Sequence, residues 1–121
     1  MPLADFYTTS NLQHEEGSIK ATIAFNADHD IFKGHFPTTP VVPGVCMMQI
    51  VKEVLERQLS QSFMLKQSSQ IKFLMFITPK DNPVVDLKIS YRIGEDGTDV
   101  QAELFNSEKA FFKMKALYKN R

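Results

Sequence analysis

One segment with helical spacing stands among segments that alternate, and this feature constrains the fold more than any other. From Gly44 to roughly Ser60, apolar residues recur every three or four positions, which is the spacing of an amphipathic helix. Pro43 comes just before it, and proline suits the first turn of a helix because its missing N–H costs nothing there. The first half of the segment is apolar on nearly every side, so we expect the helix to be buried at its start.

The other segments alternate between apolar and polar residues, which is the period of half-buried β-strands. These segments lie at 19–25, 85–91, 100–104 and 112–118, and a further strand begins near Gln70. Turn residues at 94–97 and 106–108 separate the last three strands, which predicts antiparallel hairpins. A curved antiparallel sheet wrapped around one central helix buries every apolar face of this pattern. We therefore predict an α+β fold.

Length and charge limit the classes of function. The 121 residues suffice for one core, so we expect a single domain spanning 1–121. Lys plus Arg equal Asp plus Glu at 14 each, so overall charge does not favour nucleic acid or an anionic membrane. The N-terminal residues lack a signal-peptide pattern, and no apolar stretch reaches the roughly 18 residues of a membrane span. Cys46 is the single cysteine, which excludes an internal disulfide and favours a cytoplasmic location.

The segment with the most chemical content is GHFPTTPVVPGV, residues 34–45, which ends a long loop before the helix. Three prolines restrict the chain between the imidazole of His35 and the start of the helix. The first N–H groups of a helix have no intrahelical partners, so they form a site for developing negative charge. A base and an oxyanion site on one rigid loop suit proton abstraction next to a carbonyl group.

This segment resembles the signature of the 3-hydroxyacyl-acyl-carrier-protein dehydratases, a FabA/FabZ-like family with the hot-dog fold. The family pattern is GHFP, two spacer residues and P-V-x-P-G-V running into the central helix, and its Gly, His and Pro positions are all in register here. Residues 71–81, with Lys72-Phe73 and Pro79-Lys80-Asp81, are similar to a second family segment, K-F-x-x-P-V-x-P-G-D. The resemblance covers most of the chain and implies a hot-dog fold.

The resemblance also implies a reaction, which is elimination of water from a 3-hydroxyacyl thioester to give a trans-2-enoyl thioester in fatty acid or related lipid or polyene biosynthesis. By this resemblance, His35 removes the α-proton and Gly44 donates the backbone N–H that polarises the thioester carbonyl. Phe36, Pro43 and Val45 are the expected substrate-binding residues. The implied partners are acyl carrier protein and at least a second copy of the chain, with the histidine of one subunit facing the helix of the other. No cofactor or metal is implied.

One position departs from the family pattern. The family places a carboxylate on the helix fourteen residues after the histidine, where it protonates the departing hydroxyl, but this chain has Gln49 there. A primary amide has no acidic proton near neutral pH, so Gln49 can orient a hydroxyl or satisfy backbone groups of the loop but cannot be a general acid.

Glu53 lies four residues further along the same helix face, where family members commonly carry glutamine. One helical turn moves a carboxylate by about 5 Å along the axis, which is more than a hydrogen bond tolerates. Two interpretations stay open. Glu53 serves as the acid through a shifted substrate or a bridging water, or the acid is absent from the chain.

Three functions are consistent with these residues. The first is the dehydratase itself. The second is a non-catalytic or accessory hot-dog subunit that binds acyl carrier protein or pairs with an active paralogue, and Gln49 keeps this alternative open. The third is hydrolysis of an acyl thioester, with water activated by His35 or Glu53. The GHFP motif disfavours hydrolysis because it is typical of the dehydratase branch.

Other features have two interpretations each. No acidic residue occurs from Lys109 onward, so this strand is either a solvated face or a docking surface for an acidic carrier protein. The 6 Met and 10 Phe residues line an acyl tunnel or fill an ordinary core. Cys46 is interpreted as a core residue. His29, between two aspartates, has no second histidine at ligand spacing, so we interpret this segment as a polar loop rather than a metal site.

Overall fold

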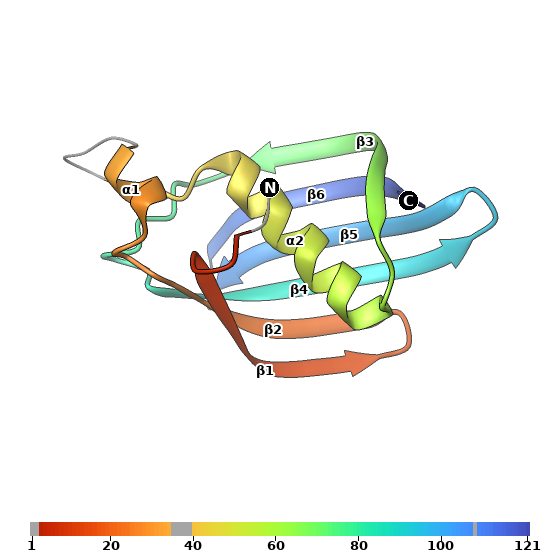
Figure 1. Cartoon of the computed structure of the whole chain (residues 1–121), viewed down its shortest axis with the longest axis horizontal. Helices are drawn as coiled ribbons and strands as arrows, with labels where there is room; N and C mark the ends of the chain where they lie inside the picture. Colours follow the sequence, from red (N-terminus) through yellow and green to blue (C-terminus); the bar gives the residue numbers. More distant parts are fainter. Residues whose placement is uncertain (1–2, 35–39, 108) are drawn as a thin grey trace.

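One antiparallel sheet packs against a long helix in the computed structural model, which describes residues 3–34, 40–107 and 109–121 (Figure 1). The elements in chain order are β1 (Tyr7–Glu15), β2 (Ser18–Phe25), α1 (Asp30–Gly34), α2 (Gly44–Leu59), β3 (Phe63–Phe73), β4 (Val84–Gly94), β5 (Gly97–Asn106) and β6 (Lys109–Asn120). Within the described residues the sheet has six strands in the order β1-β2-β4-β5-β6-β3, and all neighbours are antiparallel. The predicted α+β architecture is confirmed.

Helix α2 has the predicted bounds because its apolar residues form one continuous buried stripe. The six buried side chains recur every three or four positions, at Cys46, Met47, Ile50, Val51, Val54 and Leu55. The helix begins after Pro43, whose extended backbone makes it the N-cap rather than a residue of the first turn. It ends at Ser60, which takes the left-handed conformation with a φ of 53° and donates its N–H to the carbonyl of Glu56.

The strands alternate as their sequences predict, with one face of the sheet turned toward α2. Buried aliphatic residues of β2 and β4 alternate with exposed ones such as Lys20 and Lys88. The largest fully buried side chains include five phenylalanines, Phe6, Phe32, Phe63, Phe111 and Phe112. These residues and Phe25 join the apolar stripe of α2 in one core cluster, so six of the ten phenylalanines pack in the core.

The hairpin between β4 and β5 requires glycine at its end. Gly97 has a φ of +136°, a conformation that residues with side chains rarely adopt. A Cβ atom at Gly97 would also clash with the backbone carbonyl oxygen of Tyr118 on β6. The turn signature at 94–97 therefore does form the predicted hairpin, and Gly97 allows β6 to approach closely.

Strands β1 and β3 are the two edge strands, at opposite sides of the sheet. Strand β3 is longer than predicted, and its pairing with β6 is interrupted twice by register shifts. In the part of the chain that the structure describes, no helix is long and apolar enough to cross a membrane.

Candidate functional site

The start of α2 forms one wall of an apolar groove. The opposite wall comes from the end of β3 and the segment that follows it, which is fixed to the loop by a hydrogen bond of 2.8 Å from the Val42 N–H to the Ile77 carbonyl. The cavity has a volume of about 650 Å³, and its lining residues are Val41, Val42, Pro43, Gly44, Val45, Met47, Phe73, Leu74, Met75 and Phe76. Such a volume is typical of a ligand pocket. The structure thus brings the predicted residues Pro43, Gly44 and Val45 together in one groove.

Apolar side chains remain open to solvent along this groove. Phe76 is 78% exposed and Val45 is 67% exposed, although both are large hydrophobic residues. A contiguous exposed apolar surface is uncommon on a soluble protein and usually marks a place where something binds. The groove therefore suits an apolar ligand or partner.

The backbone at the start of α2 presents hydrogen-bond donors beside the groove. The carbonyl of Pro43 accepts the N–H groups of Cys46 and Met47 at 3.0 and 3.2 Å. Among the described residues, the N–H groups of Gly44 and Val45 have no backbone acceptor. Free N–H groups at a helix N-terminus stabilise negative charge on an oxygen atom.

Gly44 lies directly against an aromatic ring. A Cβ atom at Gly44 would lie 2.7 Å from two ring carbons of Phe73. The Phe73 ring packs on the buried ring of Phe112 with centroids 5.3 Å apart, while 55% of the Phe73 side chain is exposed. Phe73 therefore forms the groove wall directly over the first residue of α2.

The predicted residues Gln49 and Glu53 lie along one face of the same helix. Val45, Gln49, Glu53 and Arg57 are spaced by four residues, so they follow one another along one side of α2. The Gln49 Nε2 atom donates to the Glu53 Oε2 atom at 3.0 Å. This face therefore leads from the groove at Val45 through an amide to a carboxylate.

The N-terminal segment supplies the other partners of Glu53. The Leu3 N–H donates to Glu53 Oε2 at 2.9 Å, and the Tyr7 hydroxyl donates to Glu53 Oε1 at 2.8 Å. Arg57 in turn donates from Nη2 to the Tyr7 hydroxyl at 2.9 Å and places its guanidinium 5.7 Å from the centre of the Tyr7 ring. We call Leu3, Tyr7, Gln49, Glu53 and Arg57 the Glu53 cluster.

The contacts of the Glu53 cluster determine which of its polar groups donate hydrogen bonds and which accept them. All three contacts use the Glu53 side chain as an acceptor, which is the role of an ionised carboxylate. Because carboxylate oxygens only accept, the Gln49 amide must turn its NH₂ group toward Glu53, which leaves its Oε1 atom directed elsewhere. Gln49 is thus held in one orientation.

The same carboxylate affects the acidity of its neighbours. Burial raises the pKa of Tyr7 above its ordinary value, and the hydrogen bond to Glu53 and its charge raise it further, with Arg57 opposing them. Burial also raises the pKa of the Cys46 thiol, and the negative charge of Glu53 adds to the effect. Cys46 is 1% exposed, which supports its interpretation as a core residue rather than a nucleophile.

Two of the predicted site residues, His35 and Phe36, lie outside the described residues. Their assigned roles stay predictions from the motif. Conversely, the sequence analysis did not single out Tyr7 or Arg57. A spacing of four residues after Glu53 was an available signal for Arg57, whereas nothing in the sequence indicates that Tyr7, 46 residues before Glu53, would reach it.

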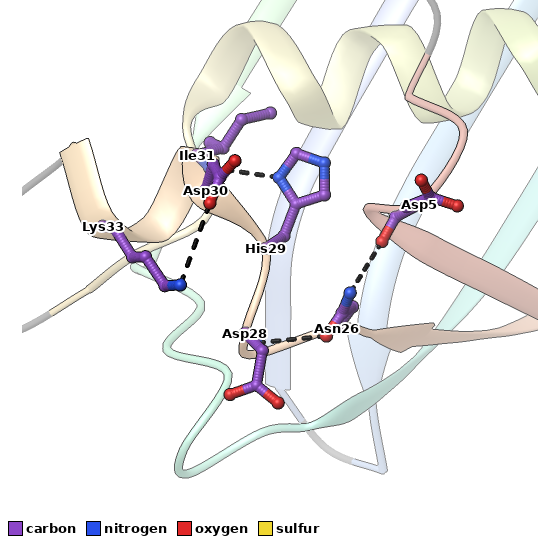
Figure 2. Close-up of polar contacts among 7 residues, drawn as sticks. All are labelled: Asp5, Asn26, Asp28, His29, Asp30, Ile31 and Lys33. Atoms are coloured by element: carbon purple, nitrogen blue, oxygen red, sulfur yellow. Dashed lines mark hydrogen bonds and ion pairs between the residues drawn. The ribbon is translucent and has the colours of Figure 1, made fainter.

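Local hydrogen bonds hold the polar loop before α1 (Figure 2). The His29 Nδ1 atom accepts the N–H of Ile31 at 3.1 Å, and the Asn26 Oδ1 atom accepts the N–H of Asp28 at 3.1 Å. Figure 2 shows the Asp28 carboxylate turned away from the His29 ring, and Asp30 pairs with Lys33 at 3.8 Å. Among the described residues, no three His, Cys, Asp or Glu side chains are grouped to hold a metal ion.

Comparison with known families adds the family assignment. A model of the ApeI dehydratase family matches residues 11–114, a range that includes the groove, Gln49 and Glu53. The chain belongs to the ApeI-like dehydratase family. The predicted dehydratase family is therefore confirmed at this level, whereas the FabA/FabZ-like branch stays a prediction. A search of curated proteins finds no match.

Solved structures with the same fold include a subunit of the dehydratase heterocomplex ApeI:P from Xenorhabdus doucetiae. It is 17% identical, with a TM-score of 0.75 and coverage of 93% of this chain and 97% of that one. An uncharacterized protein from Erwinia carotovora subsp. atroseptica is 17% identical, with a TM-score of 0.65 and coverage of 93% of both chains. A conserved protein from Pseudomonas aeruginosa is 11% identical, with a TM-score of 0.67 and coverage of 98% and 90%. At these identities the similarities show the fold, and the predicted hot-dog fold is confirmed.

Proposed function

We propose that this ApeI-like protein eliminates water from a 3-hydroxyacyl thioester carried on acyl carrier protein, which yields a trans-2-enoyl thioester. The observation that carries the proposal is the apolar groove of about 650 Å³ that begins at the N-terminus of α2. An acyl chain needs an apolar wall, and its thioester carbonyl needs a hydrogen-bond donor at one end of that wall. The groove supplies both within a family of dehydratases.

The proposed reaction assigns a role to each residue at the groove. His35 takes the proton from the α-carbon, and the N–H of Gly44 stabilises the negative charge that develops on the thioester oxygen. The bond from the β-carbon to its hydroxyl oxygen then breaks, and the hydroxyl leaves as water after gaining a proton. Phe36, Pro43 and Val45 line the path of the acyl group.

Within its described residues, a single chain has no evident donor for this last proton. Gln49 has no acidic proton, and Glu53 is held by three donors in the acceptor role. We propose that Gln49 accepts a hydrogen bond from the substrate hydroxyl through Oε1 and that Glu53 fixes the amide for this purpose. The acid then comes from elsewhere, either water or a second subunit.

A second candidate function follows from this arrangement. The absence of an acid at position 49 favours an accessory subunit that completes its site with a paralogue. The similar solved structure from Xenorhabdus doucetiae is that of a dehydratase heterocomplex, ApeI:P, which supports hetero-pairing as an alternative to a homodimer. In either assembly we place the partner subunit at a free edge of the sheet, since β1 and β3 each have an unpaired side in the single chain.

The test is a dehydration and hydration assay with 3-hydroxyacyl and 2-enoyl carrier-protein substrates, using wild type, Gln49→Glu, Glu53→Gln and the control Gln58→Glu. A glutamate at 49 has its carboxyl near Glu53 Oε2, which now accepts the Gln49 amide at 3.0 Å. The proximity of two carboxyl groups raises the pKa of one of them, so one proton is kept for donation. We expect Gln49→Glu to raise turnover about 10²–10⁴-fold. Gln58→Glu, at the far end of α2, should leave turnover unchanged.

Other outcomes distinguish the alternatives. An active wild type that loses turnover in Glu53→Gln and gains nothing in Gln49→Glu identifies Glu53 as the acid. Turnover that occurs only after a paralogous subunit is added supports the accessory function. Release of free acid in place of the enoyl product identifies a thioesterase, and the dehydratase proposal is then withdrawn.

A further inference from the structure

A row of charged side chains crosses the outer face of the sheet, the face turned away from α2. The row contains one residue from each of five neighbouring strands, placed directly opposite one another by the strand register. From β2 to β3 these residues are Lys20, Lys88, Glu103, Lys113 and Lys72. The four lysines are exposed and Glu103 is half-buried. We call these five residues the lysine row.

The lysine row places like charges next to each other. Lys20 lies directly opposite Lys88, and Lys72 lies directly opposite Lys113. Like charges in such cross-strand positions destabilise a sheet. Among the described residues the ion pairs are Lys33 with Asp30 and Arg92 with Asp99, so none of them neutralises this row. Glu103 lies directly opposite both Lys88 and Lys113 and offsets part of this repulsion, so the four lysines and one glutamate leave the row with a net charge of +3 in a chain that has no net charge.

The surroundings of the lysine row are polar and slightly hollowed. A shallow depression of about 360 Å³ includes Lys72, Lys88, Glu103 and Lys113 in its lining, together with Lys115 and the polar side chains of Ser90, Gln101 and Gln70. A surface that inserts into lipid needs apolar side chains between its charges, and this depression offers polar ones. Its chemistry fits the acidic side chains of another protein.

The dimensions of the lysine row also fit such a partner. Neighbouring strands lie about 4.8 Å apart, so the row is roughly 19 Å long. Carboxylates placed one turn apart on a helix recur about every 5.4 Å, so three to four turns of an acidic helix match its length.

One end of the lysine row lies at the groove. Lys72 and Phe73 are consecutive residues of β3, and consecutive residues of a strand point to opposite faces. Phe73 forms the groove wall over Gly44. A protein docked on the outer face at Lys72 is therefore beside the edge strand β3, whose opposite face forms a wall of the groove.

We propose that the lysine row docks the acidic surface of the carrier protein that delivers the acyl thioester. The identity of the partner rests on the proposed function, whereas the docking surface rests on the strand register and charge described above. Docking at the β3 end brings the thioester arm to the groove from the adjacent edge of the sheet.

The test compares the double variant Lys20→Gln/Lys72→Gln with the matched control Lys66→Gln/Lys119→Gln, which removes two exposed lysines from the other end of β3 and β6. Binding of carrier protein without an acyl group is measured by calorimetry at low and high salt. The row variant should bind about tenfold more weakly at low salt, and salt should reduce the difference. It should also unfold at a higher temperature than wild type, because both like-charge pairs are relieved. The control should match wild type in binding.

Turnover separates the docking surface from the reaction itself. With carrier-bound substrate, the row variant should show a raised KM and an unchanged kcat. With the same acyl group on free pantetheine, which has no protein to dock, the row variant and wild type should be equal. If no variant turns over any substrate but carrier binding is still weakened only in the row variant, the proposed function fails and the docking surface stands. Equal carrier binding in the row and control variants overturns the docking proposal. The proposal is also overturned if the row variant keeps its carrier binding but loses binding to phosphatidylglycerol vesicles or to duplex DNA.

Discussion

Removing the Glu53 carboxylate should destabilise the fold strongly, because it anchors the N-terminal segment to α2. In Glu53→Ala the N–H of Leu3, a residue 2% exposed, and the buried hydroxyl of Tyr7 both lose their acceptor. The amide of Gln49 is half-buried and can turn to water, so we do not count it. A buried donor left without a partner costs about 1–3 kcal/mol. The free energy of unfolding should therefore fall by about 3 kcal/mol, which lowers Tm by about 10–15 °C in a chain of this size.

The assay is thermal and urea unfolding followed by circular dichroism. Glu95→Ala in the exposed turn between β4 and β5 is the control, and it should stay within about 0.5 kcal/mol of wild type. Combining Glu53→Ala with Tyr7→Phe gives a double-mutant cycle in which the two losses must be less than additive, because both variants break the same hydrogen bond. Additive losses, or a Tm for Glu53→Ala equal to that of the control, would refute the anchoring role.

Two further predictions concern the aromatic residues. Gly44→Ala should cost more stability in wild type than in a Phe73→Ala background, since its Cβ would lie 2.7 Å from the Phe73 ring, and unfolding of the four variants should give a coupling of about 0.5–3 kcal/mol. Burial, with the charge of Glu56 adding to it, raises the pKa of Tyr118 from its ordinary value of 10.0 to about 12. The unfolded chain then loses this proton at lower pH than the folded chain, so stability is lost as pH rises from 10 to 12. Urea unfolding across that range should show a shallower loss in Tyr118→Phe.

The helices and strands that bury one apolar face could be predicted from the sequence. Elements without such a face could not. Helix α2 and strands β2, β4, β5 and β6 alternate or repeat because their apolar residues face the core. Strand β1 has almost no buried side chain after its first residue, so it carries no such pattern, and it joins the sheet through backbone pairing with β2. The first part of β3 likewise has exposed side chains after its first residue, so it also lacks an alternating pattern. Helix α1 has five residues, too few to show a helical period.

The candidate site could be predicted in part because one half is local and the other is not. Pro43, Gly44 and Val45 are consecutive, so the motif alone placed them at one end of the helix, and the groove there agrees with this. The opposite wall of the groove comes from residues about 30 positions later, beginning at Phe73, and helix spacing carries no information about it. The contact between Tyr7 and Glu53 likewise joins residues that only the folded chain brings together. The catalytic role of His35 stays a prediction.

The arrangement along α2 explains why an amide at 49 and a carboxylate at 53 are not equivalent to the reverse order. The two positions share a face, but position 53 is one turn further from the groove, where the N-terminal segment can reach it. A carboxylate there meets a backbone N–H and a tyrosine hydroxyl in place of a substrate, so its negative charge is used to hold the N-terminal segment against α2. Position 49 lies one turn nearer the groove, and its amide uses Nε2 for Glu53, so Oε1 is not engaged by that contact. Substitution of Glu53 should therefore lower stability and, by releasing the Gln49 amide, also turnover, whereas substitution of Gln49 should act mainly on turnover. This separation is expected only if the exchange moved the carboxylate from a chemical role to an anchoring one.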